Sequence, residues 1–188
     1  MSYLSRAARR QSIVEAAAAV VARDGLTAVT ARTVAAELKG SPGQIHHHFA
    51  STDELAAEAW CHYAEGEIAS YQDVVRGLPA RDAITLFFED LFREEGDLRP
   101  ALSRWAEAGA HAQLRPEIGA SYLVTLGRLT DVLTAVLAET HTDPAQARNA
   151  AHRLLMLGVG LAGTTRIAGP SPVPIDVVMR SAIDAETG

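Results

Sequence analysis

Residues 41–49 read SPGQIHHHF, and the segment before them, residues 30–40, reads TARTVAAELKG. Thr30 is a residue type favoured at helix N-caps, so a short helix is predicted behind it. The proline after Ser41 is tolerated at the first position of a helix, so Ser41 is expected to cap a second short helix. The apolar residues of these helices are Val34, Ala35 and Leu38 in the first and Ile45 and Phe49 in the second. The sequence therefore predicts two short helices joined by a tight turn.

Longer helices are predicted on both sides of this pair. Apolar residues recur at helical spacing over about residues 8–23, and Gly25 follows as an expected C-terminal cap. After the pair, Ser51 or Thr52 is expected to cap a fourth helix that continues to about Val74 and has acidic residues in its first turn, where the helix dipole favours them. Further helices are predicted at roughly 81–94, 98–111, 116–140, 144–166 and 174–185. The expected fold class is all-α, with about nine helices and no strand.

Composition agrees with packed helices and with a soluble protein. Of the 188 residues, 48% are hydrophobic but only 5% are aromatic. Alanine is abundant, and it has the best helix propensity, whereas sheets prefer aromatic and β-branched residues. Cys61 is the single cysteine, which excludes an internal disulfide and suits a reducing cytosol. The N-terminus has no secretory signal and no apolar run reaches membrane-spanning length, so a cytoplasmic location without membrane association is expected.

The charge distribution neither proves nor excludes DNA binding. The whole chain carries a formal net charge of −6. Residues 1–60 hold six basic and six acidic groups, and six minus six is zero, so the whole negative balance lies after residue 60. Three arginines, Arg6, Arg9 and Arg10, lie in the first ten residues and are expected to form a modest phosphate-facing arm.

The residue types of the second short helix suit DNA reading. A tight pair of helices behind a longer bracing helix is the geometry that places the second helix in the major groove. Ser41 and the first amides of this helix can hold a phosphate, and Gly43 allows close approach of the backbone. Gln44 can pair with an adenine edge, and His46 or His47 can donate to a base or a phosphate. The alternative is a short polar surface helix without a ligand.

Residues about 8–60 resemble the DNA-binding domain of the tetracycline repressor (TetR) family. The family signature runs approximately Ser-x-Gly-x-Leu-Tyr-x-His-Phe-x-x-Lys-Glu-Glu-Leu, and residues 41–55 read SPGQIHHHFASTDEL. Residues 30–35 are similar to the capped second helix of the family, and Asp24-Gly25 to the usual end of its first helix. The resemblance implies a ligand-responsive repressor without enzymatic activity or cofactor. It would bind a palindromic double-stranded DNA operator as a homodimer and be released by a small-molecule effector.

The same resemblance implies two domains, a DNA-binding domain over residues 1–52 and an effector-binding and dimerisation domain over residues 53–188. The residues expected to contact DNA are Thr30, Arg32, Thr33, Lys39, Ser41, Pro42, Gly43, Gln44, His46, His47, His48 and Thr52. Of these, the resemblance implies that Gly43, Gln44 and His46 face bases. It also implies that Thr30, Ser41, His47 and His48 contact phosphates.

Three departures from the family pattern affect the expected DNA surface. His46 stands where the family has tyrosine, and Thr52 stands where it has a phosphate-binding lysine. In the turn, Lys39-Gly40 replaces the usual Gly-Val, so a core valine is missing and the only lysine of the chain lies beside the expected DNA surface. The operator sequence of the family therefore does not transfer to this chain.

The run of three histidines could suggest a metal site. Neighbours in a helix point about 100° apart, whereas ligand pairs from one helix are spaced three or four residues apart. His46, His47 and His48 therefore cannot converge on one ion, and no metal site is predicted. A second hypothesis is pH sensitivity, because histidines protonated near phosphates would strengthen DNA binding as the pH falls through about 6.5.

The second half of the chain has no further recognisable motif. The resemblance implies that the fourth to seventh helices enclose a ligand pocket and that the last two helices pair across a dimer axis. The predicted helix over residues 144–166 is rich in small and apolar residues that allow close helix approach: Ala147, Ala150, Ala151, Leu154, Leu155, Gly158, Leu161 and Ala162. The alternative for this helix is the buried core of a monomer. The fourth helix, which would join the pocket to the DNA reader, is expected to transmit the effector signal.

The candidate pocket residues combine scarce aromatic side chains with a few polar groups. They are Cys61, His62, Tyr63, Phe88, Phe92, Trp105, His111, Tyr122 and Thr125. His62, His111 and Thr125 are the candidate polar anchors, and Trp105 is the preferred single choice. A plain core or surface role is the alternative for each of the nine.

The sequence also bears on two other classes of protein. The chain has no Gly-rich phosphate loop, no Gly-x-Ser-x-Gly motif and no His-Glu-x-x-His motif. The pairs Glu58/His62 and Glu107/His111 have ligand-compatible spacing, but the di-iron pattern is Glu-x-x-His, one residue shorter. The alternatives to a repressor are thus a small helical metal-binding or di-iron-like enzyme, and a helical protein-binding adaptor.

Overall fold

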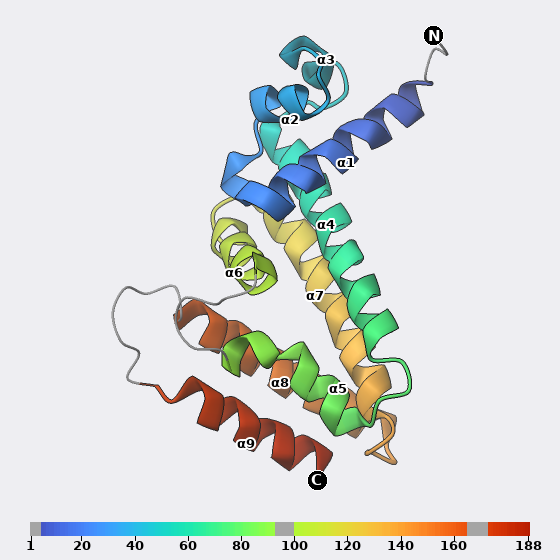
Figure 1. Cartoon of the computed structure of the whole chain (residues 1–188), viewed down its shortest axis with the longest axis vertical. Helices are drawn as coiled ribbons and strands as arrows, with labels where there is room; N and C mark the ends of the chain where they lie inside the picture. The colour runs from blue at the N-terminus through green and yellow to red at the C-terminus, as the bar shows by residue number, and fades with distance from the viewer. Residues whose placement is uncertain (1–4, 93–99, 165–172) are drawn as a thin grey trace. The chain divides into compact units, whose positions relative to one another are not determined.

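The computed structural model describes residues 5–92, 100–164 and 173–188 (Figure 1). Within these ranges it contains nine α-helices, two 3₁₀ turns and no strand, which confirms the predicted all-α fold. The elements are α1 (Arg6–Asp24), η1 (Leu26–Ala28), α2 (Ala31–Glu37), α3 (Pro42–His46), α4 (Thr52–Val74), α5 (Ala80–Phe87), η2 (Glu89–Phe92), α6 (Pro100–Ala112), α7 (Pro116–Leu137), α8 (Pro144–Thr164) and α9 (Ile175–Thr187). Parts of three predicted helices, residues 93–94, 98–99 and 165–166, lie outside the described residues.

The chain divides into two compact units. The first comprises residues 1–67 and 107–125, and the second comprises residues 68–106 and 126–188. Helices α4, α6 and α7 each contribute residues to both units. The predicted domain boundary after residue 52 was drawn between two functions, DNA binding and effector binding, and it does not coincide with the boundaries of the two compact units. The division by function stays a prediction.

In the first unit, helix caps define the segment expected to read DNA. Helix α1 ends at Gly25, whose φ of +92° is a conformation that side chains with a Cβ rarely adopt. Helix α2 begins with a reciprocal capping box, in which the backbone N–H of Thr33 donates to the Thr30 hydroxyl and the Thr30 N–H donates to the Thr33 hydroxyl. The predicted cap at Thr30 is confirmed.

Helix α3 is shorter than the apolar spacing predicted, because it ends at His46 rather than near Phe49. Ser41 occupies its N-cap position and proline its first position, but the Ser41 side chain makes no capping hydrogen bond. The backbone N–H groups of His48 and Phe49 both donate to the Ile45 carbonyl, at 2.9 and 3.1 Å, which closes the end of the helix. Ile45 and Phe49 are buried as predicted.

Helix α4 begins after Ser51, which decides between the two predicted caps. The Ser51 hydroxyl accepts the Glu54 backbone N–H at 3.0 Å, and the Glu54 carboxylate accepts the Ala50 N–H at 2.7 Å. The helix runs to Val74, as predicted. It is followed by Gly77, whose φ of +80° reverses the chain.

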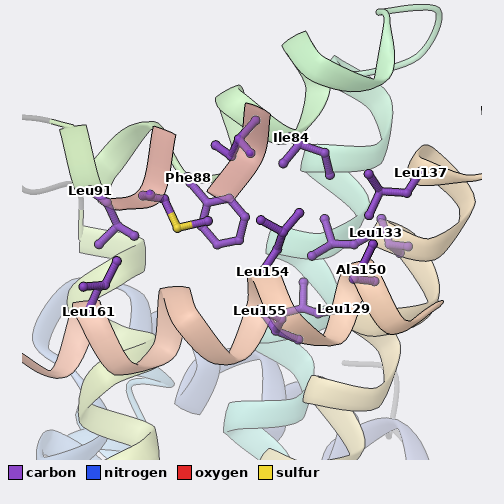
Figure 2. Packing of buried hydrophobic residues seen from close by; sticks show 14 of the residues in the cluster. Ile84, Phe88, Leu91, Leu129, Leu133, Leu137, Ala150, Leu154, Leu155 and Leu161 are labelled. Carbon is purple, nitrogen blue, oxygen red and sulfur yellow. The ribbon is translucent and has the colours of Figure 1, made fainter. Parts of the chain in front are cut away.

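The core of the second unit lies between α5, η2, α7, α8 and α9 (Figure 2). Figure 2 shows Leu154 of α8 pointing toward Phe88, and Leu161 of the same helix pointing toward Leu91. A Cβ added to Gly158 would overlap the Phe88 ring, so a glycine there lets this ring lie directly against α8. The predicted single helix over residues 81–94 is wrong in one respect: α5 stops at Phe87 and η2 follows. Phe88 forms the C-cap of α5 and is buried in the core.

The small and apolar residues singled out on α8 are all buried within the chain: Ala147, Ala150, Ala151, Leu154, Leu155, Gly158, Leu161 and Ala162. The burial of these residues is typical of a core helix, which was the alternative to a helix that pairs across a dimer axis. They are therefore not available to a partner subunit, and any dimer contact of α8 has to use its other face.

Among the described helices, α7 alone is long and apolar enough to cross a membrane by length and composition. It spans 22 residues, and 39% of its most apolar window is buried inside the protein. The core helix of a soluble protein passes the same test, so this is weak evidence for a membrane span.

Candidate nucleic-acid interface

The residues expected to contact DNA gather on α2, α3, the turn between them and the start of α4. Figure 1 shows α2 and α3 together beside the start of α4, and the two short helices pack against each other. Eleven of the twelve predicted side chains are exposed, and His48 is half-buried. Val34, Ala35 and Ile45 face inward from the same two helices. The segment thus has one apolar face in the core and one polar face in solvent.

The centre of α3 presents backbone and an amide side chain. A Cβ added to Gly43 would meet no atom within 4 Å, so the space beside this glycine is open for close approach of a ligand. A Cβ added to Gly40 would lie 2.9 Å from the Gln44 Oε1 atom. The missing valine therefore leaves room for the Gln44 side chain to lie against the turn.

Lys39 adopts a conformation that glycine prefers. Its φ is +53°, and it alone has a positive φ among the non-glycine residues that the structure describes. For a side chain with a Cβ, this left-handed conformation costs about 1–2 kcal/mol. The Gly40 N–H donates to the Ala35 carbonyl at 2.8 Å and holds the turn closed. The only lysine of the chain is thus kept on the exposed turn in a strained backbone conformation.

A shallow depression lies between α2, α3 and the start of α4. Its lining residues are Ala31, Ile45, His46, Phe49, Ser51, Thr52 and Leu55. The hydroxyl-bearing and imidazole side chains among them are exposed and carry donors suited to phosphate oxygens. His48 Nδ1 is buried and has no hydrogen-bond partner within the described chain.

The acidic first turn of α4 is neutralised by two arginines. Arg115 donates to the Asp53 carboxylate from Nε at 3.1 Å and from Nη2 at 2.5 Å, which lowers the pKa of Asp53 below its ordinary value. Arg10 pairs with both Glu54 and Glu58, and its guanidinium lies 4.4 Å from the centre of the Phe49 ring. These pairs remove negative charge that would otherwise repel phosphates beside the expected DNA surface.

The prediction that Arg10 belongs to a phosphate-facing arm is therefore wrong. Both of its carboxylate partners lie more than forty residues further along the chain, on α4. A pairing at that separation leaves no trace in local sequence spacing. Arg6 is exposed and Arg9 is half-buried.

Three of the candidate pocket residues surround a tryptophan that the sequence reasoning missed. Trp60 is fully buried in the first unit and donates its indole N–H to the Thr125 hydroxyl at 3.1 Å. The centre of its ring system lies 5.8 Å from the Tyr63 ring and 6.0 Å from the Tyr122 ring. Burial raises the pKa of the Tyr122 hydroxyl. Trp60 could have been found as one of only two tryptophans, three residues before a chosen tyrosine on one helix.

Three other candidate pocket residues belong to the second unit. Phe88 is buried in its core, Trp105 packs partly buried against the same cluster, and the Phe92 ring lies 4.2 Å from the Arg180 guanidinium. The nine candidates are thus divided between the two units.

The remaining polar candidates have separate surroundings. Cys61 is half-buried and His62 is exposed. His111 lies 3.0 Å from the Thr27 hydroxyl and 4.0 Å from the Glu107 carboxylate.

The two Glu/His pairs with ligand-compatible spacing make other contacts instead. Glu58 is paired with Arg10, and Glu107 accepts hydrogen bonds from Thr27. Within the described residues, no group of three or more His, Cys, Asp or Glu side chains is arranged to hold a metal ion.

An exposed short helix behind a tight turn, braced by α1 and followed by a helical remainder, defines a helix-turn-helix regulator of transcription. Residues 13–59 match the family model of bacterial regulatory proteins of the tetR family. The DNA-binding segment of the chain is therefore similar to that of the TetR family. The fold and the class of the chain, a transcriptional regulator, are those that the resemblance implied.

Similarity to a curated relative and to solved structures extends beyond this segment. The nicotine-responsive transcriptional repressor HdnoR of Paenarthrobacter nicotinovorans is 26% identical over 162 residues, which cover 82% of this chain and 81% of that repressor. A transcriptional regulator from Rhodococcus sp. Rha1 is 25% identical, covers 95% of this chain and 93% of its own, and superimposes with a TM-score of 0.66. The multidrug binding protein EbrR, solved with proflavin, is 26% identical, with 95% and 99% coverage and a TM-score of 0.65.

Proposed function

We propose that the protein is a ligand-responsive repressor, which binds a palindromic operator as a homodimer and leaves the DNA when a small molecule binds its helical remainder. The observation that carries the proposal is the exposed polar face of residues 30–52, which lies within the matched family segment, residues 13–59. The proposal places this regulator in the cytoplasm, acting by binding rather than by catalysis.

In the proposed complex, α3 enters the major groove and the neighbouring residues hold the backbone. Gln44 and His46 read base edges, and the open space beside Gly43 lets the helix approach closely. Hydroxyl and imidazole groups, chiefly those of Thr30 and His47, contact phosphates. Such contacts contribute few positive charges, so the salt dependence of binding should be shallow for a dimeric DNA reader.

Helices α8 and α9 offer a surface for the proposed homodimer. Met156 and Val159 are exposed on the face of α8 that points away from the core, and Val177 is exposed on α9. A Cβ added to Gly160 or Gly163 would meet no atom within 4 Å, so this face of α8 has room for another helix. Large exposed apolar side chains beside open glycines favour burial against a second copy, and a two-fold dimer matches palindromic half-sites.

For the effector we propose a small organic molecule with an apolar or aromatic body. The name of HdnoR states a response to nicotine, and EbrR was solved with proflavin. In this chain, the supporting feature is the concentration of scarce aromatic residues on the helices expected to form the pocket. Trp105, Tyr63 and Tyr122 are the aromatic contacts that we propose to test first.

Selection of DNA from a random-sequence pool by the purified protein tests this function. A fluorescein-labelled duplex of the enriched sequence should bind with an affinity that falls as salt is raised, and the enriched sequence should be palindromic. Gln44→Ala should relax the preference at one base pair in each half-site. If no sequence is enriched and no binding depends on salt, the protein is not a DNA reader and the adaptor interpretation takes precedence.

A further inference from the structure

The end of α6 carries three polar residues spaced four apart: Glu107, His111 and Arg115. Helix α6 ends at Ala112, but the Arg115 N–H donates to the His111 carbonyl at 3.0 Å, so the chain still follows a helical path there. Residues four apart share one face of a helix. We call these three residues the 107–115 clasp. They all lie within the first unit, together with α1–α3 and most of α4.

Glu107 holds the 3₁₀ turn that precedes α2. Its Oε1 atom accepts the Thr27 backbone N–H at 2.9 Å and the Thr27 hydroxyl at 2.6 Å. A Cβ added to Gly25 would overlap the same carboxylate, so Glu107 lies directly against the backbone of this turn. Its side chain is only 13% exposed, and hydrogen bonds to a carboxylate are about twice as strong as neutral ones.

His111 and Arg115 extend the attachment to the other side of the helix-turn-helix. His111 Nε2 lies 3.0 Å from the Thr27 hydroxyl, and Arg115 binds the Asp53 carboxylate through two nitrogen atoms. Thr27 lies in η1, three residues before the cap of α2, whereas Asp53 lies in the first turn of α4. The clasp therefore contacts the chain immediately before and immediately after the DNA-reading segment 30–52.

We propose that the 107–115 clasp positions the helix-turn-helix for DNA binding, and this inference rests on the proposed function. Glu107 and Arg115 are positioning residues that act on DNA through η1 and the first turn of α4. The affinity of the protein for DNA then depends on a helix outside the segment that reads it. The spacing of Glu107 and His111, which is compatible with a metal ion, is used to bind Thr27.

The test compares full-length variants for binding to the labelled duplex enriched by the wild-type protein. Glu107→Gln should weaken binding about ten-fold, within the usual range of coupling between sites. Removing a negative charge would by itself strengthen DNA binding slightly, so a loss has the opposite sign to a charge effect. The matched control is Glu117→Gln, which removes the same charge from an exposed position at the start of α7 and should not weaken binding.

Thr27 provides an independent test that leaves α6 intact. Thr27→Val removes the hydroxyl from an exposed position and should weaken binding several-fold, whereas Thr27→Ser keeps the hydroxyl and should bind like wild type. The losses of affinity in the double variant Glu107→Gln/Thr27→Val should be less than additive, because the hydroxyl contact that Thr27→Val removes is one of those that Glu107→Gln weakens. All measurements are made below the thermal unfolding transition of each variant.

Glu107→Gln binding as tightly as wild type, or additive losses in the double variant, would overturn the inference alone. Absence of salt-dependent DNA binding by the wild-type protein would overturn the proposed function, and the inference with it. The two failures are distinguishable because the first is seen only in the variants and the second already in the wild-type protein.

Discussion

The segment around α2 and α3 and the helix α8 are stabilised in opposite ways. Helices α2 and α3 span seven and five residues and bury three side chains between them, whereas α8 spans 21 residues and buries eight. The short segment is instead surrounded by polar contacts with α1, α6 and the chain before α7: Arg10 with Glu54, Glu107 with Thr27, and Arg115 with Asp53.

This difference implies that one set of contacts stabilises the fold and another fixes the orientation of α2 and α3. Burial of apolar surface is the dominant favourable term in folding and has no preferred direction, so α8 and its neighbours should supply most of the free energy of unfolding. Charge-assisted hydrogen bonds are directional and individually small. They can fix where α2 and α3 lie without contributing much stability. Substitutions in the two regions should therefore have different readouts.

The largest effect is expected from Leu154→Ala on α8. Leu154 is fully buried and points toward Phe88, so its truncation leaves a cavity and should lower the free energy of unfolding by about 3 kcal/mol (Figure 2). Urea denaturation at a fixed protein concentration measures this change. The control is Leu123→Ala on α7, where the side chain is 69% exposed and the change should stay within about 0.5 kcal/mol. Equal effects at the two leucines would contradict the core assignment.

The next substitution is in the strained turn at Lys39, and it should raise the free energy of unfolding instead of lowering it. Lys39→Gly should raise the free energy of unfolding by about 1 kcal/mol, because glycine adopts a φ of +53° without a steric penalty. The same change removes one cation per subunit from the proposed DNA surface, so for a dimer the slope of log affinity against log salt should become shallower by about 2. Lys39→Arg, the control, keeps both the charge and the strain. A less stable Lys39→Gly protein would show that the lysine side chain itself supports the turn.

Local patterns predicted most of the fold. Helical spacing of apolar residues found the nine helices that the described residues contain, and residue types at the ends found the caps at Thr30 and Ser51. Such signals depend on neighbours within one or two turns, which a sequence displays directly. The end of the fifth helix at Phe87 was missed, and Phe88, which follows it, packs against Gly158, seventy residues further along the chain, a contact that local spacing does not display.

The sequence predicted which residues of the candidate site are exposed, but not the contacts that hold the site in place. The exposed residues of α3 follow from a motif, whereas the partners of Arg10, Glu107 and Arg115 are 44 to 80 residues away in the chain. The helix over residues 144–166 shows a related limit. Its small residues were equally compatible with a partner helix and with its own core, and only the packing of the whole unit shows that the core contains them.

A smaller effect on stability is expected from a substitution of Arg10, whose ion pairs support the DNA-reading segment. Arg10→Gln should cost up to about 1 kcal/mol, because the guanidinium is partly exposed and its ion pairs are partly screened. It should weaken DNA binding more clearly, since Glu54 and Glu58 are left unneutralised beside the proposed phosphate contacts. Arg76→Gln breaks an exposed pair with Asp73 and serves as the control for both measurements. A loss of stability without a loss of DNA affinity would assign Arg10 to the core alone.

The smallest expected effect is a change in how the free energy of unfolding depends on pH. It can be compared for one ion pair from each unit. Arg115 lowers the pKa of Asp53 in the first unit, and Arg153 lowers the pKa of Glu186 in the second. A carboxyl whose pKa is lower in the folded state stabilises the protein above its unfolded value of about 4, and this contribution is lost as the pH falls through the folded value. Between pH 6 and pH 3, each arginine-to-glutamine variant should therefore lose less stability than wild type.

The loss of acid-sensitive stability should differ in size between the two variants. Glu186 is 14% exposed and bound through both of its oxygens at 2.6 Å, whereas Asp53 is 36% exposed and bound through one oxygen. Arg153→Gln should then remove up to about 1 kcal/mol of the acid-sensitive stability and Arg115→Gln only a few tenths. Urea denaturation at the two pH values measures both. A larger loss at Arg115 would mean that the polar contacts of the first unit contribute stability as well as orientation, and the separation drawn between the two regions would fail.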